Sequence, residues 1–262
     1  MKIDVTFSAT NLDELQLRDK NVVVIDVLRS STTVVTALAN GAREIIPVSN
    51  IESAVKISAS LLGDVTVRGG ERNGKMIQGF NLGNSPLEYT EGAVKGKSII
   101  YCTTNGSVAM NKCRHARNMA VAAFINISKV AEFMAQVNDE FLIICAGNTT
   151  VSHGFSMEDA VCAGMLIHKV QEEQQQQVEF TDTSTAALSL YRTHGRSILK
   201  MLKNTDHGKY LASIGFDEDL KACAKVDSVP VLPMLVGTSV KLPKEDQRAP
   251  DAEIPAVATP NS

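Results

Sequence analysis

The residues best suited to chemistry stand near the start of the chain, where an acid, an arginine and four hydroxyl residues follow an apolar run. The run is Val22–Ile25, and after it come Asp26, Arg29, Ser30, Ser31, Thr32 and Thr33. Backbone N–H groups and hydroxyls at the start of a helix bind anions, and an arginine can clamp them with two nitrogens. The stretch therefore predicts an oxyanion site beside Asp26. The structural alternative is that the hydroxyls only cap a helix and Asp26 only caps a turn.

Two later stretches end in the same manner. The apolar residues of 97–102 lead into Thr103, Thr104, Asn105 and Gly106, and those of 140–145 lead into A-G-N-T-T. In open α/β sheets the ligand site lies beyond the carboxyl ends of the strands, so neighbouring strands would bring these loops to one crevice. We therefore predict that residues 103–106 bind phosphate oxygens, with a simple turn at the N-G pair as the alternative.

Acidic residues occur near the same predicted edge. Glu71 and Arg72 follow the strand predicted for 64–68, and Glu158 and Asp159 open the helix after 140–145. Carboxylates next to a phosphate suit Mg²⁺, which takes few protein ligands and keeps several waters. The predicted metal ligands are therefore Asp26, Glu71, Glu158 and Asp159, with Arg72 as a second cation for the phosphate. The alternatives are solvated loop charges at 71–72 and ordinary first-turn acids at 158–159.

A histidine and a cysteine have two interpretations each. His207, in D-H-G, is either a general acid for a leaving group or a loop residue. Cys145, before A-G-N, is either a packing residue at a strand end or a nucleophile with a lowered pKa near a helix start. The motifs G-x-x-x-x-G-K-[ST] and G-x-G-x-x-G are absent, which disfavours a P-loop NTPase.

The elements that must position these residues alternate between strands and helices. Residues 1–7, 22–25, 44–48, 64–68, 97–102, 118–124 and 140–145 read as strands, with helices at 32–40, 51–62, from about 108, 129–137 and 156–174. This order predicts an α/β fold with a mostly parallel or mixed sheet. Helices are expected at 185–191, 196–203, 209–214 and 217–224, with D-H-G as a break, and an edge strand at 229–233. We expect one domain over 1–242, with two tightly packed lobes as the alternative, and a disordered tail over 243–262.

The composition excludes several functions. A net charge of −3, an aromatic content of 5% and the absence of tryptophan argue against nucleic acid binding. No apolar run approaches membrane-spanning length, so no membrane partner is expected. Five cysteines without zinc-motif spacing or an export signal indicate reduced thiols in the cytoplasm. A homodimer is the base-rate expectation for the oligomeric state.

An ordered set of motifs gives the sequence a resemblance. I-D-V-L-R-S-S-T-T, G-E-R at 70–72, G-F-N-L-G-N-S-P at 79–86, T-T-N-G-S at 103–107, C-A-G at 145–147 and F-S-M-E-D-A at 155–160 together resemble the 2-phosphosulfolactate phosphatases. The resemblance covers roughly residues 1–235. It implies a Mg²⁺-dependent cytosolic phosphohydrolase with a three-layer α/β/α fold, which converts 2-phospho-3-sulfolactate to 3-sulfolactate on the route to coenzyme M. It also adds Asn84, in the second glycine-rich motif, to the expected phosphate ligands.

The expected mechanism is metal-assisted phosphoryl transfer from a small anionic phosphorylated acid to water. Asp26, Arg29 and His207 are the predicted catalytic residues, and Mg²⁺ would be held by Asp26 with one or more of the other three acids. Whether Asp26 attacks phosphorus or only holds the metal is left open by the sequence. Two rivals remain: a metal-free hydrolase or transferase that depends on Cys145, and a non-catalytic binder of a phosphorylated metabolite.

Overall fold

The computed structural model describes residues 1–60, 65–149, 154–173 and 178–243, and in these ranges the strands form a single mixed sheet. Its strand order is β5-β4-β6-β3-β11-β10-β7-β2-β8-β1-β9. The strands are β1 (Lys2–Thr6), β2 (Asn21–Ile25), β3 (Glu44–Val48), β4 (Thr66–Arg72), β5 (Lys75–Met76), β6 (Ser98–Cys102), β7 (Asn118–Ala122), β8 (Glu140–Cys145), β9 (Glu179–Phe180), β10 (Met234–Val236) and β11 (Ser239–Lys241).

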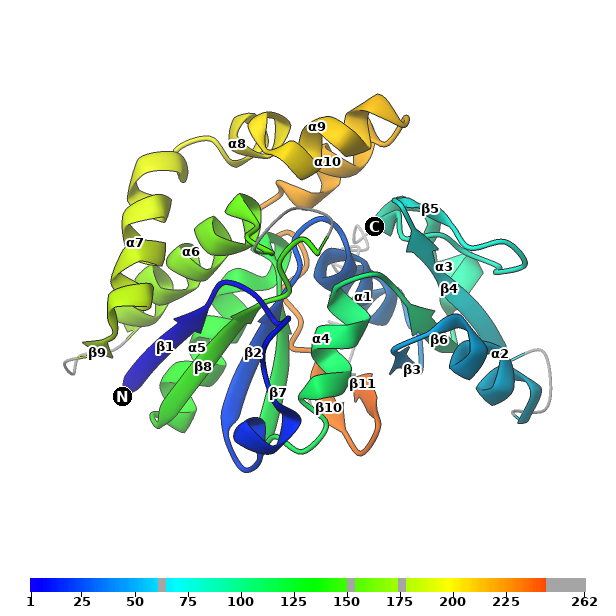
Figure 1. The fold of residues 1–262 in the computed structure, drawn as a ribbon, viewed down its shortest axis with the longest axis horizontal. Coiled ribbons are helices and arrows are strands. Elements are labelled where there is room, and N and C mark those ends of the chain that lie inside the picture. The colour runs from blue at the N-terminus through cyan, green and yellow to red at the C-terminus, as the bar shows by residue number, and fades with distance from the viewer. Residues whose placement is uncertain (61–64, 150–153, 174–177, 244–262) are drawn as a thin grey trace, which may run out of the picture.

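Helices cover both faces of this sheet (Figure 1). They are α1 (Ser30–Ala39), α2 (Ile51–Ser60), α3 (Glu91–Val94), α4 (Gly106–Lys112), α5 (Ile127–Val137), α6 (Met157–Glu173), α7 (Asp182–His194), α8 (Ile198–Asn204), α9 (Asp206–Ser213) and α10 (Asp217–Cys223), with single 3₁₀ turns at Glu14–Leu17, Pro86–Glu88 and Phe124–Asn126. None of the described helices is both long enough and apolar enough to cross a membrane.

Strand β2 shows why the sheet needs a helical layer on each side. Every residue of β2 is buried. Val23 and Ile25 join the core formed with α5, α6 and α7, whereas Val22 and Val24 join the core formed with α1 and α4. A strand with both faces covered is apolar at consecutive positions, which is what the run at 22–25 shows. The predicted three-layer α/β/α fold with a mixed sheet is confirmed.

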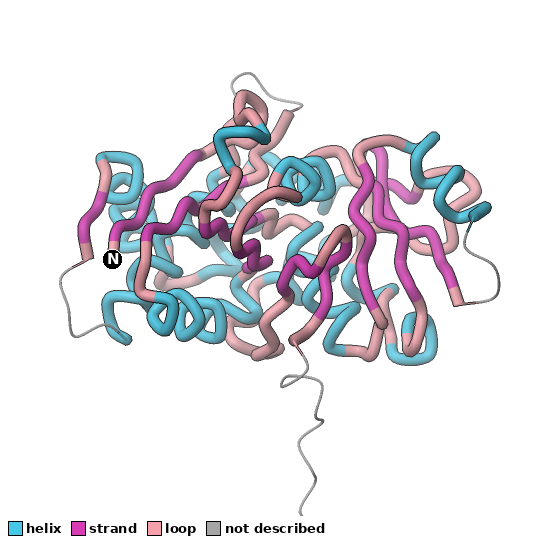
Figure 2. Tube along the Cα trace, turned by 90° about the horizontal axis from the view of Figure 1, so that it is seen from below, coloured by secondary structure: helices cyan, strands magenta, loops and turns pink. Residues whose placement is uncertain are grey.

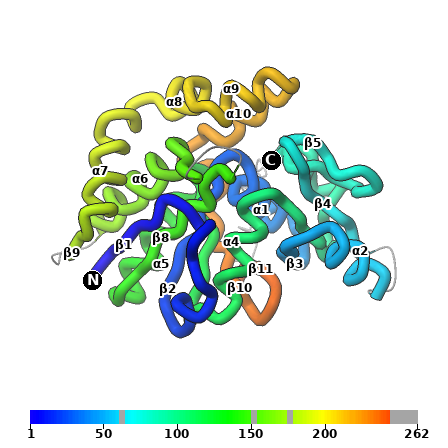
Figure 3. Tube along the Cα trace, viewed as in Figure 1, coloured from blue at the N-terminus to red at the C-terminus, as the bar shows by residue number. Residues whose placement is uncertain are grey.

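The sheet consists of two parallel groups joined by an antiparallel hairpin. Strands β1, β8, β2 and β7 are parallel to one another, as are β3, β6 and β4. The hairpin β10–β11 returns from the end of the described chain and pairs with β7 on one side and with β3 on the other (Figure 3). Seen from below, the two groups stand at opposite sides of the molecule (Figure 2).

The predicted edge strand at 229–233 is therefore wrong in two respects. The strand begins only at Met234, and its hairpin lies in the middle of the sheet. Pro230 and Pro233 have no N–H group for a ladder, which explains why pairing starts after them.

Two other local predictions need correction. Glu71 and Arg72 are the last residues of strand β4 and pair with β5, whereas the sequence placed them in a loop. The D-H-G segment begins helix α9 instead of interrupting a helix, because the Thr205 side chain accepts a hydrogen bond from the N–H of Gly208 at 3.0 Å and caps the helix. The expected disordered tail lies, from residue 244 onward, outside the described residues.

The three loops predicted to meet do so, although only two of their strands are neighbours. β2 and β8 pair directly, whereas β3, the hairpin and β7 separate β6 from β2. Helices α1 and α4 nevertheless contact each other between the two strand groups. The hydroxyl of Ser30 consequently lies 3.2 Å from that of Thr103. The convergence thus depends on helix packing as well as on strand pairing.

Candidate active site

A cavity of about 230 Å³ lies at this meeting point, at the carboxyl ends of both strand groups. Helices α8, α9 and α10 lie across these strand ends in Figure 1. The residues that line the cavity are Asp26, Leu28, Arg29, Ser30, Glu71, Asn73, Gly74, Asn84, Thr104, Asn105, Asn148, Asp206, His207 and Tyr210.

Asp26 lies at the end of β2 and is held by the first turn of α1. The backbone N–H of Ser30 donates to Asp26 Oδ1 at 3.3 Å, and the N–H of Ser31 donates to the Asp26 carbonyl at 2.8 Å. Burial raises the pKa of the Asp26 carboxyl to about 6, although the charge of His207 and hydrogen bonds from Ser30 oppose the shift. Asp26 is therefore mostly ionised at neutral pH, while its ionised form is poorly solvated.

Gly106 allows helix α4 to approach this carboxylate. A Cβ atom on Gly106 would lie 2.6 Å from Asp26 Oδ2 and 2.4 Å from the Ser30 Cβ. No side chain fits at those distances, so the glycine is needed where α4 meets the start of α1. The sequence signal for this glycine is the N-G pair, which predicts either phosphate binding or a turn.

His207 faces Asp26 from helix α9 and is paired with Glu158 from α6. His207 Nδ1 lies 3.4 Å from Glu158 Oε1, and the Glu158 side chain is 2% exposed. Burial lowers the pKa of His207, but the hydrogen bond and the charge of Glu158, together with the charge of Asp26, outweigh burial and raise that pKa above its ordinary value. The imidazole is thus favoured in its protonated form, opposite an ionised carboxylate.

Glu71 joins two loops on the opposite side of the cavity. Its Oε1 accepts a hydrogen bond from the N–H of Thr104 at 2.8 Å, and its Oε2 accepts one from the N–H of Gly74 at 2.9 Å. The carboxylate thereby fixes the β4–β5 turn against the loop between β6 and α4. Each oxygen keeps a second lone pair, so these contacts leave room for another ligand.

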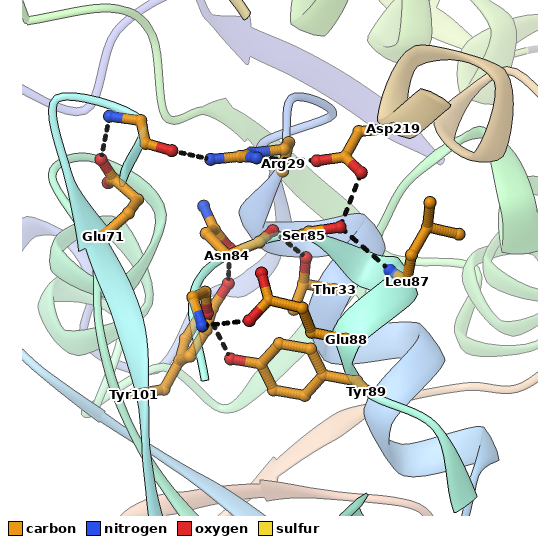
Figure 4. A network of polar contacts seen from close by, with 12 residues as sticks. Arg29, Thr33, Glu71, Asn84, Ser85, Leu87, Glu88, Tyr89, Tyr101 and Asp219 are labelled. Atoms are coloured by element: carbon orange, nitrogen blue, oxygen red, sulfur yellow. Dashed lines mark hydrogen bonds and ion pairs between the residues drawn. The ribbon is translucent and has the colours of Figure 1, made fainter. Parts of the chain in front are cut away.

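Arg29 lines the cavity, but both of its terminal nitrogens bind protein groups. Nη1 forms an ion pair with Asp219 Oδ2 at 2.7 Å, and Nη2 donates to the Gly74 carbonyl at 2.5 Å (Figure 4). The guanidinium also lies 4.3 Å from the centre of the Phe216 ring. Arg29 therefore connects α10 to the β4–β5 turn, and its use as an anion clamp stays a prediction.

Asn84 is positioned by buried neighbours. Its side-chain oxygen accepts a hydrogen bond from the Tyr101 hydroxyl, and its backbone carbonyl accepts one from Thr33 Oγ1 at 2.8 Å. The next residue, Ser85, donates to Asp219 Oδ1 at 2.6 Å, so Arg29 and Asn84 belong to one connected network (Figure 4). These hydrogen bonds hold the loop from residue 79 to 85 in place ahead of the 3₁₀ turn Pro86–Glu88.

This arrangement is accompanied by clear similarity to known proteins. A family model described as 2-phosphosulpholactate phosphatase matches residues 7–238. A protein of Caldanaerobacter subterraneus subsp. tengcongensis named "Probable 2-phosphosulfolactate phosphatase" is 38% identical over 225 residues, which is 86% of this chain and 91% of that protein. The chain belongs to the 2-phosphosulfolactate phosphatase family. Proteins with the same name from Clostridium acetobutylicum and Clostridium beijerinckii are 37% identical over 234 residues (89% of this chain, 97% of that protein) and 35% identical over 233 residues (89% and 96%).

Several residues that the sequence predicted as phosphate ligands do not line the cavity of this phosphatase-family chain. Ser31 Oγ accepts from the N–H of Asp26 at 2.9 Å, and Thr32 Oγ1 donates to the Val27 carbonyl at 2.9 Å. Thr103 Oγ1 accepts from the N–H of Ser107 at 2.9 Å. Arg72 points away, with Nη1 on the Glu71 carbonyl and Nη2 on Cys102 Sγ. These side chains build the loops, and Ser30, Asn84, Thr104 and Asn105 are the predicted phosphate ligands that line the cavity.

The four predicted metal ligands are likewise placed in different settings. Asp159 accepts hydrogen bonds from two backbone groups, the N–H of Val27 at 2.8 Å and that of Gly147 at 3.3 Å, and does not line this cavity. Burial raises the pKa of Asp159 well above its ordinary range, and the charges of Asp26 and Glu158 add to the rise. Throughout the described ranges, no three His, Cys, Asp or Glu side chains are placed to share one ion.

The carboxylates that line the cavity could still hold a metal ion that takes only one or two protein ligands. Asp26 and Glu71 both line the cavity, and Mg²⁺ in phosphoryl-transfer sites often takes one or two carboxylates together with water and phosphate oxygens. Sequence reasoning overlooked a third lining acid, Asp206, because it read D-H-G as a break with a single functional histidine. Asp219 was missed as well, since an acid in the first turn of a helix is usually a dipole partner.

Cys145 is a core residue. Its side chain is fully buried among apolar groups, and burial raises the pKa of its thiol well above the ordinary value. A nucleophilic cysteine needs a lowered thiol pKa and contact with the substrate. The structure therefore disfavours the Cys145-dependent alternative, for which the position before A-G-N was the only signal.

Proposed function

We propose that this protein is a Mg²⁺-dependent phosphatase that hydrolyses 2-phospho-3-sulfolactate, or a similar small phosphorylated hydroxy acid, to 3-sulfolactate and phosphate. Membership of the family and the names of its relatives support the substrate class. The observation that carries the chemistry is that Asp26 and His207 line the same cavity. Burial raises the pKa of Asp26 only to about 6, which leaves the acid mostly ionised at neutral pH, and the raised pKa of His207 favours a protonated imidazole opposite it.

In this proposal each partner has a separate task. Asp26 acts at phosphorus or holds the phosphate's cation, and the hydrogen bonds from the first turn of α1 fix its orientation. Because Nδ1 of His207 faces Glu158, Nε2 is the nitrogen that can donate a proton to the leaving alkoxide. Ser30, Asn84, Thr104 and Asn105 surround the phosphoryl group.

Mg²⁺ would be held by Asp26 and Glu71 and would neutralise the charge of the phosphate. The contacts of Glu71 with Thr104 and Gly74 set the position of its carboxylate before any ligand binds. A cytoplasmic location, a part in coenzyme M biosynthesis and a homodimeric state belong to the same proposal and stay predictions.

The test is phosphate release from 2-phospho-3-sulfolactate and other phosphorylated hydroxy acids, with Mg²⁺ and with a chelator. Asp26→Asn should lower kcat by about a thousandfold or more while the circular dichroism spectrum stays unchanged. The matched control is Asp182→Asn, at an exposed first-turn acid of α7.

Near-normal turnover in Asp26→Asn would refute the assignment of the site. Thermal stabilisation by these esters without any phosphate release would instead favour the non-catalytic binder.

A further inference from the structure

A second cavity, of about 680 Å³, adjoins the candidate active site. It lies between the start of α6, the link from α7 to α8, and the start of α9. Asn148, Asp206 and His207 line both cavities and mark where they meet. His207, which would protonate the leaving oxygen, thus lies between the smaller cavity on the phosphate side and a cavity about three times larger on its other side.

The larger cavity has the chemistry of a small-molecule site. Its apolar walls include Phe155, Met157 and Met201, and its cations are Arg196 and Lys200. In the part of the chain that the structure describes, neither cation has an ion-pair partner, whereas Lys203 of α8 is paired with Asp217 at 3.7 Å. Ligand sites of several hundred Å³ commonly combine apolar walls with a few charged groups.

The wall that carries the cations is attached to the protein core. Ile198, Met201 and Leu202 of α8 are buried in the core shared with α6 and α7. Lys200 and Asn204 lie one turn apart on that helix and both line the cavity. Lys200 is therefore presented from a helix fixed by packing, and Arg196 lies two residues before that helix begins.

From these features we propose that the larger cavity is the leaving-group subsite, which takes phosphomonoesters whose organic part is an extended chain with a terminal anionic group. The chain would contact the apolar walls, and the terminal anion would pair with Arg196 and Lys200. In this proposal a three-carbon acid would need only the smaller cavity. This inference rests on the proposed phosphatase function and extends its substrate class.

The test compares two esters that share a hexyl chain, ω-carboxyhexyl phosphate with a terminal carboxylate and hexyl phosphate without one, and uses 2-phospho-3-sulfolactate as the short reference. The wild-type kcat/KM should be about tenfold higher for the carboxylated long ester than for the uncharged one. The double variant Arg196→Met/Lys200→Met should abolish this preference and leave turnover of the short substrate unchanged. The matched control is Arg192→Met/Lys203→Met, which removes two cations of α7 and α8 that line neither cavity.

Equal kcat/KM for the two long esters in the wild type would overturn the proposal, and so would a double variant that slows all three substrates alike. Calorimetric titration with ω-carboxyhexylphosphonate and hexylphosphonate separates this failure from failure of the phosphatase function. If no ester releases phosphate, the phosphatase function fails, while a preference of about tenfold in Kd that the double variant removes still supports the subsite. Equal Kd values for the two phosphonates would refute the proposed subsite.

Discussion

The buried ion pair between Arg29 and Asp219 should be the most sensitive contact in the support of the site. Their side chains are 1% and 3% exposed, and the pair also connects to Ser85 and to the carbonyl of Gly74. Removing one partner leaves a charge in a poorly polar environment, which typically costs about 3–5 kcal/mol. Asp219→Asn keeps an oxygen that can accept one hydrogen bond, so we expect a loss of about 2–3 kcal/mol in the free energy of unfolding.

The measurement is urea unfolding followed by circular dichroism. With an m-value of about 3 kcal/mol per M, the midpoint should fall by about 0.7–1 M. The matched control is Asp217→Asn on the same helix, whose ion pair with Lys203 is exposed and should contribute less than about 1 kcal/mol. Activity should fall as well, because Arg29 holds the Gly74 carbonyl and Glu71 binds the N–H of the same residue.

A double-mutant cycle distinguishes the pair from a general packing defect. Arg29→Met alone leaves the Asp219 carboxylate unpaired, whereas Arg29→Met/Asp219→Asn removes both charges. The double variant should be more stable than the sum of the two single losses indicates, by about 1 kcal/mol or more. Strict additivity, or an Asp219→Asn protein within about 0.5 kcal/mol of wild type, would refute this account.

Three further predictions follow from single contacts. Gly106→Ala should lower kcat at least about tenfold, because its Cβ would collide with Ser30 and Asp26, whereas Gly92→Ala, with no atom within 4 Å of the new Cβ, should have no effect. Burial would raise the pKa of Glu44, but hydrogen bonds from Ser98, Lys241 and Ser239 lower it to about 2. The stability that Glu44 supplies is thus complete above pH 4.5, the ordinary value, and is lost as the pH falls towards 2. Glu44→Gln should therefore flatten that part of the stability profile, by about 1 kcal/mol after allowance for solvent screening, and an unchanged profile would contradict the assignment. Cys145→Ala should change kcat less than about twofold and destabilise the protein by about 1 kcal/mol, and loss of turnover in a folded variant would reinstate the cysteine mechanism.

The sequence by itself determined the elements with strong local signals. Val22–Ile25 is buried on both faces, and the apolar run before Cys145 is buried except for the half-buried Leu142, so an uninterrupted apolar pattern marked both as central strands. The site edge followed from the same logic, because small and hydroxyl residues after such strands indicate loops at the carboxyl ends. Asp26, Ser30, Asn84 and Asn105 were found in this way or through the family resemblance, and His207 was found as a candidate general acid in D-H-G.

Tertiary structure alone decided which predicted residues share the cavity. Thr103 and Ser31 have the residue type of phosphate ligands, yet their hydroxyls bind loop N–H groups, and which neighbour a hydroxyl meets depends on contacts distant in sequence. Asp219 reaches Arg29 across 190 positions, and no local pattern records such a partner. The central position of the β10–β11 hairpin was equally hidden, because each of its strands is short and pairs through few residues.

Long-range packing also explains why only some of the predicted acids face the cavity. Local sequence placed Asp26, Glu71 and Asp159 at one edge of the sheet, and all three lie near it. Packing then directed Asp159 to two backbone N–H groups and left Asp26 and Glu71 facing the cavity. Residue type and strand order thus determined where a phosphate site could form. Long-range packing, which sets distances and solvent access between distant segments, decided which carboxylates can serve it.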